Sequence, residues 1–411
     1  MRNGTSSKII ISVMLVLTMV MMSACATFDS FKHTIIEETD NRDNVIRIGV
    51  FEPQTGRYSD AGLSEIKGIE LANSIYNTVD GYKVELVKVD TQSTTTAAET
   101  AIQGLIEMKP VAIIGSCGEA TSLIASKYVD QAKIPTITPS ATNPLITQNY
   151  RYYCRASLTG SQIGEGIAEY AYRYLNSGHI GIVTAANDTA ATALLNGFNT
   201  KMKKYGKSDL VVMQEAADLD NTDVNSIINK IKDNAIDTLF IPLGTEAMDA
   251  FFTAIEAAGL TAISFIGTKA WGDEDFIQMM KKHPSINIAF PYQSVLNGNN
   301  ATITDEAERF LIQYANKYGD SDTPTENAAL GYDAYLLLIN AIHNAESLQG
   351  EEIRNAIHKL SNVKCATGIF NFDDRGNTVR GVNISTIKNG KIVSLHVTED
   401  IAETVEIEEI E

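Results

Sequence analysis

The sequence predicts an α/β protein with two doubly wound lobes, each a parallel sheet with helices on both faces. The first observation is length: 411 residues are enough for two or three domains. The second is a repeated alternation of short apolar runs with amphipathic stretches, in two successive blocks. The third is a globular composition, 44% hydrophobic and 20% charged. In such folds ligands bind outside the carboxyl ends of the strands.

The first block begins at an apolar run, residues 45–51, which is typical of a strand. A helix is predicted over residues 64–77, because Ile66, Ile69 and Ile75 recur at helical spacing. The block continues in the same rhythm, with strands at 82–89, 111–115 and 135–138 and helices at 95–108 and 120–132.

The second block repeats the pattern. It has predicted strands at 180–184, 210–213, 238–242 and 264–267, separated by helices at 190–205, 224–233 and 247–258. Three further helices are predicted after it, at 306–318, 328–345 and 353–360. Because parallel strands need crossover helices, this order favours parallel sheets in both blocks.

Residues 1–24 have the layout of a secretory signal: Arg2 and Lys8 precede an apolar run that ends in small residues. The run of about 14 residues is shorter than the roughly 20 that span a bilayer, although an uncleaved anchor remains the alternative. The sequence Met22-Ser23-Ala24-Cys25 resembles a bacterial lipoprotein box, which implies that Cys25 is lipidated and becomes the first mature residue. Residues 25–44 are polar and are expected to be a tether.

The charge balance excludes some partners. A formal net charge of −18 argues against nucleic acid, which needs a surplus of Lys and Arg on some face. It also argues against docking on anionic lipid through a basic surface. Residues 399–411 carry acidic and no basic side chains, and we expect a solvated acidic tail there.

The sequence gives little support to catalysis. It has six scattered histidines and no H-E-x-x-H, P-loop or G-x-S-x-G motif, so we predict no catalytic residue, metal or cofactor. The glycine-flanked residues 115–118 could hold a nucleophile, but without a partnering histidine a ligand-contacting turn is favoured. Cys117, Cys154 and Cys365 allow three different single bridges or three free thiols, and the sequence does not choose among them.

Several segments carry a family resemblance, in order: residues 48–56, 111–115, 134–144, 257–260 and 370–377. The most specific is the string Pro-Ser-Ala-Thr-Asn-Pro at 139–144. Together they resemble the type I periplasmic binding proteins, most closely the leucine/isoleucine/valine-binding branch of amino-acid ABC transporters. The resemblance extends over residues 45 to 395.

The resemblance implies two lobes joined by three crossovers, near residues 155–160, 289–294 and 367–370. The expected division of the chain is residues 1–24 as signal, 25–44 as tether, 45–157 plus 293–367 as lobe 1, 158–292 plus 368–398 as lobe 2, and 399–411 as tail.

The resemblance also implies a set of ligand-binding positions: Tyr58, Glu119, Ala120, Thr121, Ser140, Ala141, Thr142, Thr189 and Lys269. Trp271 is added because its loop lies at the carboxyl end of the 264–267 strand. Ser140 and Thr142 suit a ligand carboxylate, because they offer hydroxyl and amide donors. Two positions depart from the family pattern, with Glu119 in place of a serine and Lys269 in place of the acid that pairs with the ligand's ammonium.

We interpret these departures as a zwitterion bound in reversed or shifted orientation, with Lys269 facing its carboxylate and Glu119 its ammonium. Alternatively, Lys269 points to solvent at the rim. Trp271 is either a wall of the ligand site or core packing.

The function implied is that of an extracytoplasmic, lipid-anchored solute-binding protein, not an enzyme. It would capture an amino acid or a related small carboxylate and deliver it to an ABC permease. The alternative is a ligand sensor of the same fold that acts on a receptor. Turnover of a bound compound would instead favour an enzyme.

Overall fold

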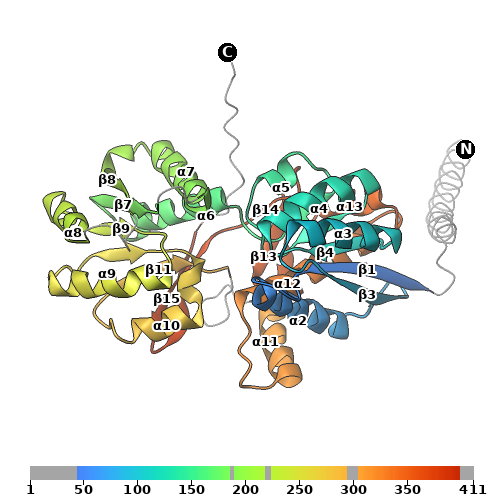
Figure 1. Cartoon of the computed structure of the whole chain (residues 1–411). Helices are drawn as coiled ribbons and strands as arrows, with labels where there is room; N and C mark the ends of the chain where they lie inside the picture. The colour runs from blue at the N-terminus through green and yellow to red at the C-terminus, as the bar shows by residue number, and fades with distance from the viewer. Residues whose placement is uncertain (1–43, 186–188, 218–223, 294–303, 399–411) are drawn as a thin grey trace, which may run out of the picture.

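The computed structural model describes residues 44–185, 189–217, 224–293 and 304–398. These residues form two lobes, seen side by side in Figure 1, and each lobe contains one large sheet. The predicted α/β class with two doubly wound lobes is therefore confirmed. The predicted signal, Cys25, almost all of the tether and the acidic tail lie outside the described residues.

The sheet of lobe 1 has the strand order β2-β3-β1-β4-β5-β6. Its strands are β1 (Val45–Glu52), β2 (Thr78–Val79), β3 (Tyr82–Asp90), β4 (Ala112–Gly115), β5 (Thr136–Thr138) and β6 (Tyr153–Arg155). All neighbours pair in parallel except β2 and β3. The central strands β4 and β5 are wholly buried, which explains their continuous apolar runs.

Helices cover both faces of this sheet: α2 (Ser59–Ile75), α3 (Thr95–Glu107), α4 (Glu119–Ala132), α5 (Leu145–Gln148), α11 (Asp305–Tyr318), α12 (Glu326–Asn344) and α13 (Gly350–His358). Threonine caps begin three of them, since Thr94, Thr304 and Thr325 each accept an N–H of the first turn. Helix α2 starts five residues before the predicted position.

Helices α2 and α12 pack with their backbones in close contact. A Cβ at Gly68 would lie 1.8 Å from the Ala328 carbonyl oxygen, and one at Gly331 would lie 2.3 Å from that of Glu65. Only glycine permits this approach. The contact fixes the position of Glu65 against α12.

The sheet of lobe 2 has the order β16-β15-β11-β10-β9-β7-β8. Its strands are β7 (Ile180–Thr184), β8 (Val211–Ala216), β9 (Thr238–Phe240), β10 (Ser264–Ile266), β11 (Asn287–Pro291), β15 (Asn383–Lys388) and β16 (Lys391–Val397). Strands β7 to β11 pair in parallel, but β15 pairs antiparallel with both β11 and β16. The sheet is therefore mixed, whereas the sequence analysis predicted only parallel strands.

The main helices of lobe 2 are α6 (Gly160–Glu169), α7 (Thr189–Lys204), α8 (Val224–Asp233), α9 (Thr245–Ala257) and α10 (Glu274–Met280). The bounds of helix α6 were not predicted, because its glycines interrupt the apolar pattern. One of them, Gly164, allows the close packing of α6 on α7, since a Cβ there would lie 1.9 Å from the Leu194 carbonyl oxygen.

The last crossover lies later in the chain than expected. Strands β12 (Val363–Cys365), β13 (Gly368–Phe372) and β14 (Thr378–Val379) form a small sheet beside lobe 1. Phe370 is buried in the lobe 1 core, whereas Val382 belongs to the core of lobe 2. The assignment of 368–379 to lobe 2 was thus wrong, because β13 pairs with β12 rather than with a strand of that lobe.

One buried side chain connects the three crossovers. The Gln293 Oε1 atom accepts hydrogen bonds from the Leu158 amide (3.1 Å) and from Arg380 Nη2 (2.7 Å). Arg380 Nη1 donates to Thr367 Oγ1 (2.7 Å), which in turn donates to Asp333 Oδ2 (2.5 Å). We call Leu158, Gln293, Asp333, Thr367 and Arg380 the crossover cluster. It ties all three connections to one point between the lobes.

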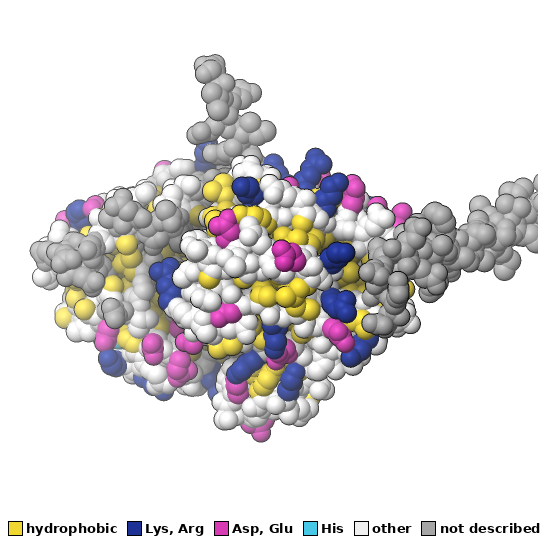
Figure 2. All heavy atoms as spheres, turned by 45° about the vertical axis from the view of Figure 1, so that its right-hand side comes forward, with side chains coloured by type: hydrophobic (Ala, Val, Ile, Leu, Met, Phe, Trp, Pro, Cys, Tyr) yellow, Lys and Arg dark blue, Asp and Glu magenta, His cyan; other side chains and the backbone are white. Residues whose placement is uncertain are grey.

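The surface of lobe 1 that faces the viewer in Figure 2 carries interspersed acidic and basic side chains. No broad patch of one sign is visible on that face. Among the described residues, no helix has both the length and the apolar character needed to cross a bilayer.

Candidate ligand-binding site

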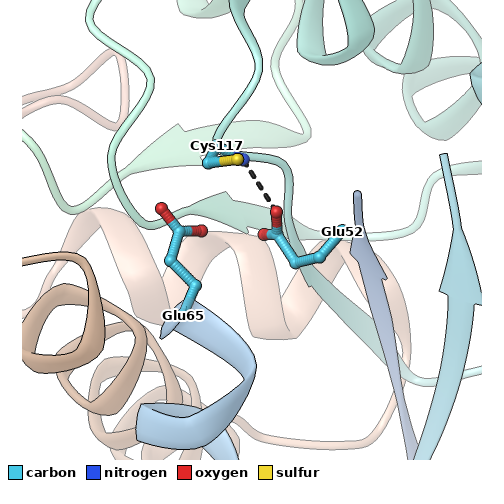
Figure 3. Close-up of side chains that lie close together, drawn as sticks. All are labelled: Glu52, Glu65 and Cys117. Carbon is cyan, nitrogen blue, oxygen red and sulfur yellow. Dashed lines mark hydrogen bonds between the residues drawn. The ribbon is translucent and has the colours of Figure 1, made fainter. Parts of the chain in front are cut away.

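Four polar side chains meet at the carboxyl-terminal edge of the lobe 1 sheet. Glu52 is the last residue of β1, Cys117 follows β4, and Ser140 follows β5. Glu65 reaches the same place from α2, as Figure 3 shows for the two glutamates and Cys117. We call Glu52, Glu65, Cys117 and Ser140 the glutamate cluster. Its position is the one at which doubly wound sheets bind ligands.

The two glutamates are completely buried, with 0% of either residue exposed. Glu52 Oε2 accepts a hydrogen bond from the Cys117 amide (2.9 Å), and Glu65 Oε1 accepts one from the Ser140 hydroxyl. The other two carboxyl oxygens, Glu52 Oε1 and Glu65 Oε2, are buried without a hydrogen-bond donor. The two carboxyl groups point toward each other (Figure 3), so they can bond to one another only when one is protonated.

The charge state of the pair follows from its surroundings. Burial raises the pKa of Glu65 to about 7, although hydrogen bonding and the positive charge of Lys269 oppose the rise. Burial also raises the pKa of Glu52 well above its usual range, and the neighbouring Glu65 carboxylate adds to the effect. The pair therefore retains a proton near neutral pH.

Lys269 belongs to lobe 2, and its positive charge opposes the rise in the pKa of Glu65. It begins the short 3₁₀ helix η3 (Lys269–Gly272), directly after β10, and its side chain is exposed. Burial raises the pKa of Glu326, at the start of α12, and the charge of Lys269 opposes that rise as it does for Glu65. Because Glu65 and Glu326 both belong to lobe 1, Lys269 provides a positive charge from the other lobe.

The donors predicted for a ligand carboxylate are bound to glutamates of the chain itself. The Ser140 hydroxyl donates to Glu65. The amide and hydroxyl of Thr142 donate to Glu119 Oε1 at 2.8 and 3.0 Å, and the Asn143 amide donates to Glu119 Oε2 at 2.9 Å. Glu119 thus closes onto its own lobe, with three hydrogen bonds to the 142–143 loop.

The remaining lobe 1 positions have local contacts. Thr121 is buried, and its hydroxyl donates to the Gly118 carbonyl at 2.9 Å. Ala141 is also buried, and its amide donates to Thr138 Oγ1 at 3.2 Å. Ala120 is exposed in the first turn of α4. Tyr58 is exposed and lies against the Arg57 guanidinium, 4.3 Å from its ring centre. The structure therefore groups Glu119, Thr121 and 140–142 around the loops after β4 and β5.

Thr189 and Trp271 are the other two ligand-binding positions predicted in lobe 2. Thr189 begins helix α7, and its side chain lies outside the described residues. Trp271 is fully buried in the lobe 2 core, where its Nε1 donates to the Leu243 carbonyl (2.9 Å) and its ring stacks on Phe276 at 4.8 Å. The assignment of Trp271 to the ligand site was therefore wrong, since its single N–H is satisfied inside the core.

Cys117 is both one of the three candidate disulfide cysteines and a candidate metal ligand. Cys117, Cys154 and Cys365 are all free thiols, so none of the three possible bridges is formed. The donor atoms of Glu52, Glu65 and Cys117 lie within 4.8 Å of one another, and carboxylate and thiolate together suit a metal such as zinc. Lys269 directs a positive charge at the same groups and opposes a bare divalent cation. We therefore do not assign a metal centre.

Sequence reasoning missed Glu52, Glu65 and Glu326 as site residues. A signal was available for Glu52, because an acid at the end of an apolar strand is placed at the ligand-binding edge. Glu65 falls beside the apolar positions of a helix, where burial of a carboxylate needs a partner. The sequence alone did not show that the two side chains converge.

Comparison with known proteins agrees with this architecture. The profile of the family described as "Periplasmic binding protein" matches residues 45–391. This chain belongs to that family. The resemblance to its type I branch, with leucine-binding and branched-chain binding members among the structural relatives, is thereby confirmed.

Individual relatives extend the comparison. An amino acid binding protein of Pseudomonas aeruginosa is 25% identical over 198 residues, which are 47% of this chain and about half, 52%, of the relative. The leucine binding protein LivK from Thermotoga maritima is 27% identical, with a TM-score of 0.69 over 86% of this chain and 99% of its own. A solute binding protein of Rhodopseudomonas palustris, solved with 3,4-dihydroxybenzoic acid, shares the fold at 20% identity, with a TM-score of 0.68 over 88% and 99% of the two chains.

Proposed function

We propose that this chain is the solute-binding component of an ABC importer and that it captures an amino acid or a related small carboxylate between its two lobes. One observation carries the proposal: a buried glutamate pair lies at the strand ends of lobe 1, and an exposed lysine follows a strand end of lobe 2 and opposes the rise in the pKa of Glu65. One structural relative is described as a leucine binding protein and another was solved with 3,4-dihydroxybenzoic acid, and both compounds are small and bear a carboxylate.

The mechanism is closure rather than a chemical step. Two lobes held at one crossover cluster can rotate about it, and a solute that contacts both lobes stabilises the closed arrangement. The proposed contacts from the family pattern are Tyr58, Glu119 to Thr121, Ser140 to Thr142, Thr189 and Lys269. To these we add Glu52 and Glu65.

We further propose that the protein is extracytoplasmic and held to the membrane by a lipid on Cys25. The support is the family, whose members act outside the cytoplasm, and the tripartite pattern of residues 1–25. Incorporation of radiolabelled lipid into the full chain, and its loss in Cys25→Ala, would test the anchor. A Ser23→Ala variant is the matched control, because it leaves the cysteine and the small-residue pattern intact.

The function itself is tested by uptake. Amino acids and benzoates that raise the unfolding temperature of the full chain in detergent are then supplied, radiolabelled, to cells with and without the gene. We expect loss of uptake on deletion for the solutes that bind. Binding without any change in uptake would contradict the transport role and favour a sensor that reports to a receptor.

A further inference from the structure

We infer that the site has an unusual polarity: Glu52 and Glu65 of lobe 1 receive a positively charged nitrogen of the solute, and Lys269 of lobe 2 receives its anionic group. This inference rests on the proposed function and names the class of solute, a zwitterion or an amine, that the site selects. It replaces the expectation that Glu119 faces the ammonium, because Glu119 is already bonded to Thr142 and Asn143.

The first support is the hydrogen-bond inventory of the glutamate cluster. Glu52 Oε1 and Glu65 Oε2 are buried acceptors without donors, in residues with 0% exposure. Among the described residues, neither glutamate belongs to an ion pair of lysine, arginine or histidine. Near neutral pH the proton that the pair retains can bridge the two carboxyl groups, and an ammonium group, which has several N–H donors and a positive charge, would take its place.

The second support is the loss of the usual anion site. The hydroxyl of Ser140 and the donors of Thr142 are the groups that suit a solute carboxylate, and they hold Glu65 and Glu119 instead. An anion placed there would face two glutamates at close range. Glu65 is buried and Glu119 is exposed, and a negative charge on either repels an anion, so these donors disfavour the anionic end of a solute.

The third support is Lys269, which supplies the missing positive charge from the opposite lobe. Lys269 is exposed at the start of η3, directly after β10 and so at the carboxyl end of a lobe 2 strand, and its charge opposes the rise in the pKa of Glu65 and Glu326 in lobe 1. A zwitterion satisfies both ends at once, because its nitrogen neutralises the singly protonated pair and its carboxylate neutralises the lysine. A bare metal dication would satisfy the glutamates but be repelled by Lys269.

The test uses two matched sets of probes on the full chain in detergent. The first set is L-leucine, 3-methylbutylamine and 4-methylpentanoate; the second is 4-(aminomethyl)benzoate, benzylamine and benzoate. Each set contains a zwitterion, its amine and its acid on one carbon frame. Calorimetry at neutral pH should show, in at least one set, the zwitterion as the tightest binder and the acid weaker than the amine by about tenfold or more.

Variants then separate the two ends of the solute. Glu52→Gln and Glu65→Gln should weaken the zwitterion and the amine by about tenfold or more and leave the acid unchanged. Lys269→Met should weaken the zwitterion and leave the amine unchanged. Glu85→Gln and Lys282→Met are exposed, matched controls away from the cluster, and we expect no effect from either. Circular dichroism checks that every variant is folded.

Other results overturn the inference in distinguishable ways. If an acid probe binds as tightly as its zwitterion, the polarity is wrong and the proposed solute-binding function stands. If amine binding survives both Gln variants, the glutamate pair is not the receptor. If Zn²⁺ alone binds in a manner that Glu65→Gln abolishes, and EDTA abolishes probe binding, the cluster is a metal site. If none of the six probes binds, both the inference and the proposed amino-acid function are contradicted.

Discussion

The crossover cluster and the glutamate cluster are both buried and charged, but they differ in how their charges are satisfied. In the crossover cluster, Thr367 links the Arg380 guanidinium to the Asp333 carboxylate, and only Nε of Arg380 is left without an acceptor. In the glutamate cluster, two carboxyl groups of like charge face each other, with two acceptor oxygens left over. The first arrangement holds the lobes together by itself. The second is satisfied only while the pair holds a proton or when a cationic group replaces that proton.

The largest effect should come from breaking the crossover cluster. Arg380→Met removes the donors to Thr367 and Gln293 and leaves Asp333 buried without its counter-charge. We expect a loss of about 3–5 kcal/mol in the free energy of unfolding, measured by urea denaturation. The double variant Arg380→Met/Asp333→Asn should recover part of the loss. A loss below about 1 kcal/mol for the single variant would contradict a structural role.

A substitution in the glutamate cluster should raise the free energy of unfolding, whereas Arg380→Met lowers it. The pKa of Glu65 is raised from 4.5 to about 7 by burial, so the folded state binds a proton that the unfolded state has released between those pH values. The stabilising contribution of this proton is complete below about pH 4.5 and is lost as the pH rises to about 7.

Glu65→Gln removes that titration and should raise the free energy of unfolding at neutral pH by up to about 3 kcal/mol. Urea denaturation across this pH range measures the difference between wild type and variant. Groups that also face Glu65 are Glu52, Cys117 and Lys269, and they stay in place in the variant. If the free energies of unfolding of wild type and Glu65→Gln change with pH in parallel, burial does not raise the pKa of Glu65.

A smaller loss of stability is expected from a substitution at Trp271, in the core of lobe 2. Trp271→Phe removes the Nε1–H that serves the Leu243 carbonyl and should cost about 1–3 kcal/mol, because a buried acceptor is left unsatisfied. Binding of L-leucine should change less than twofold, in contrast with Lys269→Met, which lies two residues away. A selective loss of affinity with unchanged stability would return Trp271 to the ligand site.

The smallest effect is expected at Glu119. Its carboxylate is exposed, and it accepts three hydrogen bonds from Thr142 and Asn143. Glu119→Ala should therefore lower the free energy of unfolding by about 1 kcal/mol, and Glu119→Gln by less. Thermal denaturation of the two variants side by side measures the difference. Equal and large losses for both would mean that the negative charge itself is required.

The alternation of apolar runs and helical spacing was enough to predict most strands and helices, because buried parallel strands and crossover helices leave strong periodic patterns. The hairpin strands at 368–379 were assigned to the wrong lobe, since pairing of β13 with β12 is a tertiary choice that local pattern does not encode. The bounds of helix α6 were missed because its glycines serve close packing on α7 rather than a turn.

The candidate site was harder to predict. The family pattern pointed to the loops after β4, β5 and β10 and assigned the donors of Ser140 and Thr142 to a ligand. Those donors are used by Glu65 and Glu119, a substitution that becomes visible only when three separate segments are brought together. Trp271 was misassigned for a similar reason. It follows the exposed Lys269 by two residues, but its side chain is buried in the core, which the sequence does not reveal.

The most direct test of the account is proton release on binding. The zwitterion with the largest thermal shift is titrated into the full chain near pH 7, by calorimetry in two buffers of different ionisation enthalpy. A positively charged nitrogen at the glutamate pair lowers the pKa of Glu65, so wild type should release protons and Glu65→Gln should not. Binding with no proton release from wild type, or with proton uptake, would contradict the assignment of Glu52 and Glu65 as the receptor for the solute's cationic end.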